Sequence, residues 1–274
     1  MTRPTPHPHR TVAELSRLDG RVVLVTGGAG CIGQVAAAGL AEQGAHVVVI
    51  DRDPSVVDEV AALLEAQGGR ATPLAVDLED EDQVVGIVPR ALAAAGRIDG
   101  LVHLASLVNA EPLPGWTSDV VHQSTATWRR ALEVNLTAAF TLTRECIPAL
   151  REGGFGSVVF TGSTYGLVGP DWGVYEGTDM GNSAAYAVSK GGVSQMARWF
   201  ATTLAPAVRV NTLVPGGVER GQPASFVSRY EARTPMARMA VEEDYKGPIV
   251  FLMSDLSRYV TGHDLVVDGG WTAW

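Results

Sequence analysis

Cysteine is scarce in this sequence, and the two cysteines stand far apart. Cys31 and Cys146 are the complete set among 274 residues, and neither has a partner at Cys-x-x-Cys spacing. The sequence therefore indicates neither a disulfide framework nor a zinc site, and we expect two free thiols. The six histidines are equally scattered, so we expect no bound metal.

A net positive charge and long apolar runs are also lacking. The formal net charge is -9, and no basic face is concentrated anywhere, which argues against a nucleic-acid partner. No apolar run reaches membrane-spanning length, and residues 1–10 lack the apolar segment of a signal peptide. We therefore expect a cytoplasmic protein with no membrane partner, in which residues 1–17 form a disordered tail.

Hydrophobic residues, in contrast, are abundant. They make up 46% of the chain, which is enough for a large core in a single domain that we expect to span residues 18–274. The expected strands cover residues 22–25, 46–50, 71–76, 100–105, 156–161, 207–214 and 264–267. Helical patterns lie between them, at about 32–43, 54–67, 79–95, 128–143 and 186–204. This alternation predicts an α/β fold, with a doubly wound, parallel seven-stranded sheet and helices on both faces.

A glycine-rich turn joins the first strand to the first helix. Residues 22–33 read Val-Val-Leu-Val-Thr-Gly-Gly-Ala-Gly-Cys-Ile-Gly. Glycines let the backbone approach a pyrophosphate, and the free N–H groups of a helix N-terminus face its negative charge. Asp51 closes the next strand, where a carboxylate can accept hydrogen bonds from an adenosine ribose. The unit predicts dinucleotide binding by a Rossmann-like sheet rather than an ordinary loop.

Other small and polar residues follow the remaining strands. Ligands of parallel sheets bind beyond the carboxyl ends of the strands. This rule gathers several positions at one edge: Gly27, Asp51, Asp77, Ala105, Ser163 and Pro215.

Tyr186 and Lys190 stand four residues apart in a helical pattern and therefore share one face of that helix. A neighbouring ammonium lowers the pKa of a phenol, which is ordinarily ~10, and fits it for proton exchange with a hydroxyl or carbonyl. Taken alone, such a pair is also a common accident of helix surfaces.

Residues 18–271 carry an ordered set of motifs that resembles the short-chain dehydrogenase/reductase family. The matching segments are Thr26-Gly27 with Gly33, Asp77-Leu78, Asn135-Leu136-Thr137, Ser163, Tyr186-x-x-x-Lys190, Arg209-Val210-Asn211 with Pro215-Gly216, Thr261-Gly262, and Val267-Asp268-Gly269-Gly270. The resemblance implies that Tyr186 is the general acid/base and that Ser163 orients the substrate oxygen. It implies that Lys190 holds the nicotinamide ribose and lowers the Tyr186 pKa. It also implies that Asn135 holds a water for a proton relay, although an amide in a helix can simply satisfy backbone groups.

The resemblance further implies a nicotinamide dinucleotide cofactor. The implied binding residues are Gly27, Gly30, Cys31, Ile32, Gly33, Asp51, Arg52, Asp77, Leu78, Ala105, Ser106, Tyr186, Lys190, Pro215, Gly216 and Val218. We expect NAD rather than NADP, because the Asp51 carboxylate would repel a 2′-phosphate. Arg52 leaves the choice open, since an arginine there can clamp that phosphate or stack on adenine.

Three features depart from the family's common pattern. Cys31 replaces a glycine, and residues 103–106, His-Leu-Ala-Ser, replace Asn-Asn-Ala-Gly. At both places the sequence resembles the longer members of the family, which modify nucleotide sugars. The third is an insertion at about 167–182, whose Gly, Pro and Asp content predicts a loop. This insertion can contact the substrate or another subunit, and we favour the substrate.

We expect an NAD-dependent oxidoreductase that interconverts a secondary alcohol and a ketone. The charged segment at about 216–245 is the expected substrate lid. It holds four arginines that could meet an anionic substrate, although charged loop residues are commonly just solvated: Arg220, Arg229, Arg233 and Arg238. The departures favour a sugar or sugar derivative over a steroid, acyl thioester or polyketide.

Two alternatives stay open. An epimerase or dehydratase with tightly bound NAD would use the same tyrosine. We disfavour it, because members of that branch of the family carry an additional C-terminal substrate domain. A non-catalytic dinucleotide-binding protein would have no need of the Tyr, Lys, Ser and Asn set. The resemblance also implies a homo-oligomer, either a tetramer or a dimer, formed through the helices that contain Asn135 and Tyr186.

Overall fold

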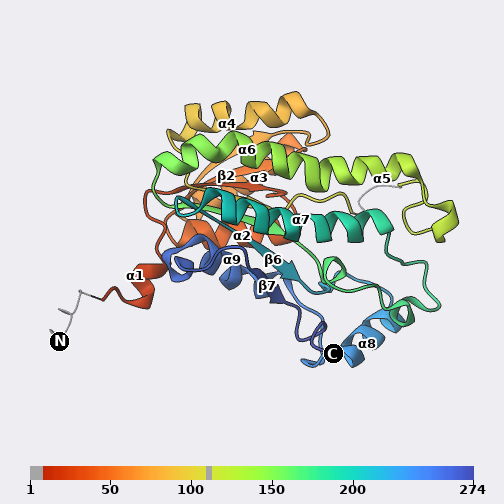
Figure 1. Cartoon of the computed structure of the whole chain (residues 1–274). Helices are drawn as coiled ribbons and strands as arrows, with labels where there is room; N and C mark the ends of the chain where they lie inside the picture. The colour runs from red at the N-terminus through yellow and green to blue at the C-terminus, as the bar shows by residue number, and fades with distance from the viewer. Residues whose placement is uncertain (1–8, 109–112) are drawn as a thin grey trace.

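A seven-stranded parallel sheet lies between two layers of helices in the computed structural model, which describes residues 9–108 and 113–274 (Figure 1). The strands are β1 (Val22–Thr26), β2 (His46–Asp51), β3 (Arg70–Ala75), β4 (Gly100–His103), β5 (Gly156–Thr161), β6 (Val208–Pro215) and β7 (Asp264–Val267). The helices are α1 (Val12–Ser16), α2 (Cys31–Glu42), α3 (Pro54–Ala66), α4 (Glu81–Ala95), α5 (Thr125–Leu132), α6 (Ala138–Glu152), α7 (Ala184–Leu204), α8 (Ala224–Arg233) and α9 (Lys246–Met253). The predicted fold class is confirmed.

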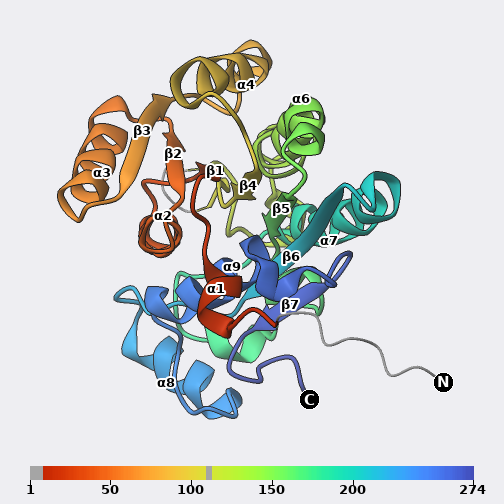
Figure 2. The same ribbon diagram turned by 90° about the vertical axis from the view of Figure 1, so that its left-hand side faces the viewer.

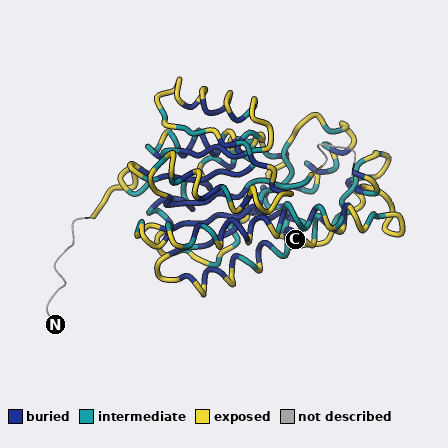
Figure 3. The backbone as a smooth tube through the Cα atoms, turned by 90° about the horizontal axis from the view of Figure 1, so that it is seen from above, coloured by how far each residue is buried: buried dark blue, intermediate teal, exposed yellow. Residues whose placement is uncertain are grey.

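Both faces of the sheet are buried. In β2, Val47 and Val49 pack with α2, α3 and α9, whereas Val48 and Ile50 pack on the opposite face with α4, α6 and α7. Side chains alternate between faces along a strand, so a strand covered on both sides needs a continuous apolar run. Figure 2 shows the two helical layers, and Figure 3 shows the buried backbone concentrated in the sheet.

The strand order is β3-β2-β1-β4-β5-β6-β7. From β1 the chain builds outward in one direction through β2 and β3, and then returns to place β4 on the other side of β1. This reversal separates the connections that follow β1 and β4, and it leaves a crevice beyond their carboxyl ends. The sheet therefore fixes where a ligand site can form.

One predicted helix is interrupted. The pattern expected as a single helix over 128–143 folds as α5, a π-helical segment η2 (Glu133–Thr137) and α6. A π-helical turn uses i→i+5 hydrogen bonds and is frequent at functional sites. The apolar period of the sequence gave no sign of it, because the flanking helices keep their buried faces.

The chain differs from the expectation at its N-terminal end. Residues up to 17 were predicted to be disordered, but α1 forms within them, and Thr11 and Glu14 make a capping box at its start. Arg10 also pairs with Asp255 at 2.6 Å. Residues 1–8 lie outside the described residues. No helix in the described part of the chain is long and apolar enough to cross a membrane, and the cytoplasmic location stays a prediction.

The boundaries of other elements shift by one or two residues. The α4 helix begins at Glu81 rather than residue 79 because the Asp80 side chain accepts hydrogen bonds from the N–H groups of Asp82 and Gln83. Strand β4 ends at His103 rather than residue 105. Neither shift moves a strand end away from the crevice.

The turn between β1 and α2 needs glycine for steric reasons. Gly27 has φ +67°, which favours glycine. A Cβ at Gly33 would lie 2.0 Å from the Gly27 carbonyl oxygen and 2.8 Å from the Cα of Gly28. These contacts are with backbone, so a side chain at Gly33 would force the turn apart.

Gly33→Ala should therefore lower the free energy of unfolding by at least about 2 kcal/mol, as overpacking against rigid backbone does. Gly86→Ala is the matched control, because Gly86 is also helical and a Cβ there meets nothing within 4 Å. Alanine is the better helix former by ~1 kcal/mol, so this control should keep or gain stability. Thermal unfolding measures both variants, and equal melting temperatures would contradict the steric account.

Candidate active site

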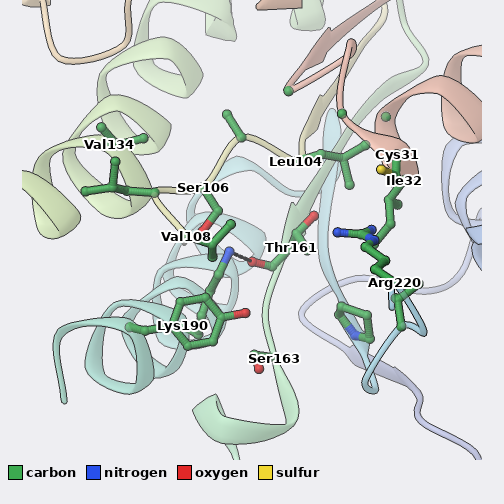
Figure 4. Close-up of a pocket in the computed structure, with 18 of the residues that line it drawn as sticks. Cys31, Ile32, Leu104, Ser106, Val108, Val134, Thr161, Ser163, Lys190 and Arg220 are labelled. Atoms are coloured by element: carbon green, nitrogen blue, oxygen red, sulfur yellow. Dashed lines mark hydrogen bonds between the residues drawn. The ribbon is translucent and has the colours of Figure 1, made fainter. Parts of the chain in front are cut away.

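A cavity of about 740 Å³ lies beyond the carboxyl ends of the strands (Figure 4). Its lining comes from the segments that follow β1, β2, β3, β4, β5 and β6, together with α7 and the segment that contains α8. The cavity is thus continuous from the glycine turn to Tyr186. Residues far apart in the sequence meet there because parallel strands end at the same edge.

The glycine turn forms one end of the cavity. The N–H of Gly30 donates to the Gly27 carbonyl at 3.0 Å, which closes the turn and directs the start of α2 into the cavity. A Cβ at Gly27 would lie 2.6 Å from the backbone nitrogen of Ala105. Cys31 and Ile32, the first residues of α2, line the space. The free N–H groups of this helix start can hold an anionic group such as a diphosphate.

Two carboxylates stand beside this turn. Asp51, at the end of β2, accepts hydrogen bonds from the Ala29 N–H at 3.1 Å and the Arg52 N–H at 2.8 Å. These bonds hold its carboxylate at the cavity wall. Asp77 and Leu78 follow β3 and line the same space, as expected for residues that surround an adenosine group.

Arg52 lies near other carboxylates. Hydrogen bonds from Ser55 and Arg130 lower the pKa of Asp53 and Glu79, respectively, and the charge of Arg52 lowers both further. The positive charge of Arg52 therefore already acts on two negative groups.

Tyr186, Lys190 and Ser163 meet at the other end of the cavity. Tyr186 and Lys190 lie on one face of α7, and the Lys190 ammonium is 5.7 Å from the centroid of the Tyr186 ring. The Lys190 Nζ donates to the Thr161 carbonyl at the end of β5, at 2.8 Å (Figure 4). This bond ties α7, which carries Tyr186 and Lys190, to the strand that is followed by Ser163.

Burial is the largest influence on the Tyr186 pKa, which it raises. Hydrogen bonding to Ser163 and the charge of Arg220 act in the opposite direction and lower the pKa of Tyr186. Lys190, which we expected to lower it, is not among these influences. Burial lowers the pKa of Lys190 itself to about 7, because a charged ammonium is poorly solvated there. The lysine therefore carries less charge near neutral pH than the sequence suggested.

Asn135 lies behind the cavity rather than in its lining. Within η2, its Oδ1 accepts from the Leu107 N–H at 2.6 Å, and its Nδ2 donates to the Ser189 hydroxyl at 3.0 Å. Ser189 in turn donates to the Tyr186 carbonyl at 2.8 Å. The amide thus joins the segment after β4 to α7, while the expected water remains a prediction.

His103, which departs from the family's usual asparagine, is buried at the end of β4. Its Nδ1 lies 2.9 Å from the Thr26 hydroxyl. Burial, with a further contribution from the charge of Lys190, lowers the pKa of His103 to about 3. The imidazole is therefore neutral at physiological pH, and it serves as a packed polar link between β1 and β4.

The four arginines of the expected lid have protein partners. Arg220 lines the cavity, and in Figure 4 its side chain extends on the side of Cys31 and Ile32. The others bind other parts of the segment or the insertion. The pairs are Arg220 with Glu242 at 3.0 Å, Arg233 with Asp171 at 2.9 Å, Arg238 with Asp244 at 2.7 Å, and Arg229 with the Glu176 carbonyl.

The structure brings together nearly all of the residues singled out in the sequence. Ser163 and every residue expected to bind the cofactor line the cavity, whereas Asn135 does not. Their individual roles stay predictions. Sequence reasoning missed the anchoring carbonyl of Thr161 and the two rings of Tyr165 and Tyr175, which also line the cavity. An aromatic residue in a loop rich in glycine was the available signal for Tyr175.

Across residues 9–108 and 113–274, no group of three or more His, Cys, Asp or Glu side chains is placed to hold a metal ion. Cys31 is an exposed free thiol, and Cys146 is a buried one.

Comparisons with known proteins agree with this geometry. Residues 27–272 match the sequence model of the family described as Enoyl-(Acyl carrier protein) reductase. The chain is 37% identical over 259 residues to the cis-4-hydroxycyclohexanecarboxylate dehydrogenase of Sinomonas cyclohexanicum, covering 92% of this chain and 97% of that protein.

Solved structures show the same fold. A short-chain type dehydrogenase/reductase from Mycobacterium marinum is 28% identical, with a TM-score of 0.85 over 97% of this chain and 100% of that one. A gluconate 5-dehydrogenase from Burkholderia cenocepacia, in complex with NADP and tartrate, is 26% identical, with a TM-score of 0.84 over 96% and 100%. The cavity, the sequence match and the shared fold agree, and the chain belongs to the short-chain dehydrogenase/reductase family of oxidoreductases.

Proposed function

We propose that this protein interconverts a secondary alcohol and a ketone, with a nicotinamide dinucleotide as hydride carrier. The observation that carries this proposal is the meeting of Tyr186, Ser163 and Lys190 in one cavity with the glycine turn. A proton-exchanging phenol at one end and an anion-binding helix start at the other are what such a reaction requires.

The residues at the glycine turn fit the dinucleotide. Gly27 packs so closely on the Ala105 backbone that a Cβ there would clash, which holds the turn against the end of β4. The α2 helix start offers N–H groups with no acidic residue in its first turn. When bound, the dinucleotide supplies the nicotinamide carbon that accepts or gives the hydride. We assign its diphosphate to the turn, its adenosine to Asp51 and Asp77, and its second ribose to Lys190.

The chain's own residues manage the proton. The Tyr186 phenolate accepts the hydroxyl proton when an alcohol is oxidised, and the phenol returns it when a ketone is reduced. Burial raises the pKa of Tyr186, and Ser163 and Arg220 offset part of that rise. The Ser163 hydroxyl orients the substrate oxygen. We assign Asn135 a positioning role, because its amide holds Leu107 of the cavity wall. The segment at 216–245 is the proposed lid.

Tyr186→Phe should reduce kcat by ~10²–10⁴-fold, the usual contribution of a general acid/base. The ring remains and the hydroxyl is lost, so the melting temperature and the Kd for reduced dinucleotide should stay near those of the wild type. Tyr259→Phe is the control, because Tyr259 is fully exposed at 101%. Steady-state kinetics measure the loss of turnover, and fluorescence titration measures dinucleotide binding. A wild-type kcat in Tyr186→Phe would refute the role of Tyr186 as general acid/base.

NAD is the proposed form of the cofactor. The Asp51 carboxylate is held at the cavity wall by two backbone N–H groups, where it suits ribose hydroxyls and repels a 2′-phosphate. Arg52 is the residue that could compensate that phosphate, but its charge already acts on Asp53 and Glu79. The balance of charge at the end of β2 therefore favours NAD.

We expect a preference for NAD of at least roughly tenfold in kcat/KM, equivalent to ~1.4 kcal/mol. Asp51→Ala should narrow that ratio because it removes the repulsion. Asp58→Ala removes a carboxylate from the exposed side of α3 and should leave the ratio unchanged. Steady-state kinetics with NAD and with NADP, run side by side, measure the ratio of the two kcat/KM values. Equal use of both cofactors by the wild type would show that Arg52 outweighs Asp51.

We also infer a homo-oligomer that forms through α6 and α7. Phe140 on α6 is 40% exposed, and Val188 and Trp199 on α7 are 51% and 56% exposed. Large apolar side chains gathered on neighbouring helices are typical of an association surface. This supports the assembly that the resemblance implied.

Trp199→Glu should lower the subunit number, because it would bury a charge in the interface. Tyr259→Glu places the same charge on another exposed aromatic position and should leave the assembly intact. Sedimentation velocity measures the subunit number, and a monomeric wild-type protein would contradict the inference.

A further inference from the structure

We propose that the insertion and α8 of the lid segment pack together as an aromatic wall of the substrate pocket, and that Tyr175 on this wall selects a compact apolar ring that bears the reacting alcohol. The inference rests on the proposed function and adds the substrate class. It also decides between the two roles that the sequence left open for the insertion.

The insertion and the lid segment share a small core of their own. Val174 is buried with Phe226 and Tyr230 of α8, and Met239 and Trp271 complete the cluster. Phe226 and Tyr230 lie 5.9 Å apart between ring centroids, and Tyr230 stacks on Trp271 at 4.3 Å. Burying such rings contributes substantially to stability, so the insertion is packed rather than loosely attached.

Two arginines of α8 reinforce this core. Arg233 forms an ion pair with Asp171 at 2.9 Å, and its guanidinium lies 5.2 Å from the centroid of the Trp271 ring. Arg229 donates to the carbonyl of Glu176. These arginines were candidates for an anionic substrate, but their contacts hold the insertion against α8 instead.

Tyr175 is the residue of the insertion that this packing presents to the cavity. It ends a short 3₁₀ turn, η4 (Trp172–Tyr175), and its ring centroid lies 5.4 Å from that of Phe226. Its hydroxyl donates to the Tyr165 hydroxyl at 2.8 Å. The Tyr165 N–H in turn donates to the Ser163 hydroxyl oxygen at 3.2 Å. The wall is therefore connected through Tyr165 to Ser163, the group proposed to orient the reacting oxygen.

Apolar side chains from two further segments line the same cavity. The polar Arg220 and Gln222 line it too, and their side chains are bonded to Glu242 and to the Val218 carbonyl, respectively. Leu107 and Val108 line the cavity after β4, and Phe226 and Met239 line it from the lid segment. A sugar would place several hydroxyls against these side chains without partners, and each unpaired hydroxyl costs free energy. We therefore propose a less polar ring in place of the sugar expected from the sequence.

One further polar group can be accommodated. Asn182 lines the cavity, and its Oδ1 is buried without a hydrogen-bond partner among the described residues. Buried acceptors of this kind are normally satisfied. A second hydroxyl on the ring could donate a hydrogen bond to the Asn182 Oδ1. The proposed substrate class is therefore an alicyclic secondary alcohol with few other polar groups.

The test compares substrates and variants. For the wild type, kcat/KM should be at least roughly tenfold higher for cyclohexanol and cyclopentanol than for gluconate or L-rhamnose. Tyr175→Ala should raise the KM for cyclohexanol about tenfold while kcat changes less, because ring contact is lost and the proton-exchanging groups stay. Tyr175→Phe keeps the ring and should raise KM less than Tyr175→Ala. Tyr259→Ala, at an exposed position, is the control without an expected effect.

Two results would overturn the proposal. They are a preference of the wild type for gluconate or L-rhamnose, and an unchanged KM in Tyr175→Ala. If the unchanged KM comes with loss of subunits, the insertion is a subunit contact.

A second readout separates this proposal from the proposed function. Cyclohexanol should raise the melting temperature of the protein–NADH complex, and Tyr175→Ala should abolish that rise. If the rise and its loss are seen without turnover of any alcohol, the ring site stands and the proposed function fails. If turnover is seen but the rise survives in Tyr175→Ala, the wall is refuted.

Discussion

The close approach of two backbones at the switch between β1 and β4 is the constraint on which the site depends. Gly27 lies so near Ala105 that a Cβ would come within 2.6 Å of the backbone nitrogen. The contact sets the floor of the cavity and directs α2 into it. Because β2 and β5 lie on opposite sides of this pair, Asp51 and Ser163 fall at opposite ends of one continuous space.

A second contact fixes the chemistry within that space. The Lys190 ammonium donates to the Thr161 carbonyl, which joins the α7 helix to the end of β5. Asn135 lies outside the cavity lining and supports it, because its amide joins Leu107 to Ser189 of α7. The reacting groups are therefore held by buried hydrogen bonds to the scaffold, which is how an active site is preorganised. The aromatic wall then closes the open side of the same space.

Continuous apolar runs, alternating with helical patterns and separated by glycines, were enough to predict the seven strands, their parallel direction and the sheet edge that carries Asp51 and Ser163. They could not reveal the π-helical turn around Asn135, because that turn leaves the flanking apolar faces unchanged. The sequence also could not predict the partners of Lys190 and of the lid arginines, because an ion pair such as Arg233 with Asp171 joins residues far apart in the chain. Burial, which shifts the pKa of Lys190 to about 7, depends on the same long-range packing.

The most direct test of the account follows the hydrogen itself. The protein is incubated with NAD and cyclohexanol that carries deuterium at the carbinol carbon, and the reduced dinucleotide is analysed by mass spectrometry. The account predicts reduced dinucleotide with the deuterium in its nicotinamide ring, formed together with cyclohexanone. Reduced dinucleotide without deuterium, or none from any secondary alcohol although the dinucleotide binds, would contradict hydride transfer at this site.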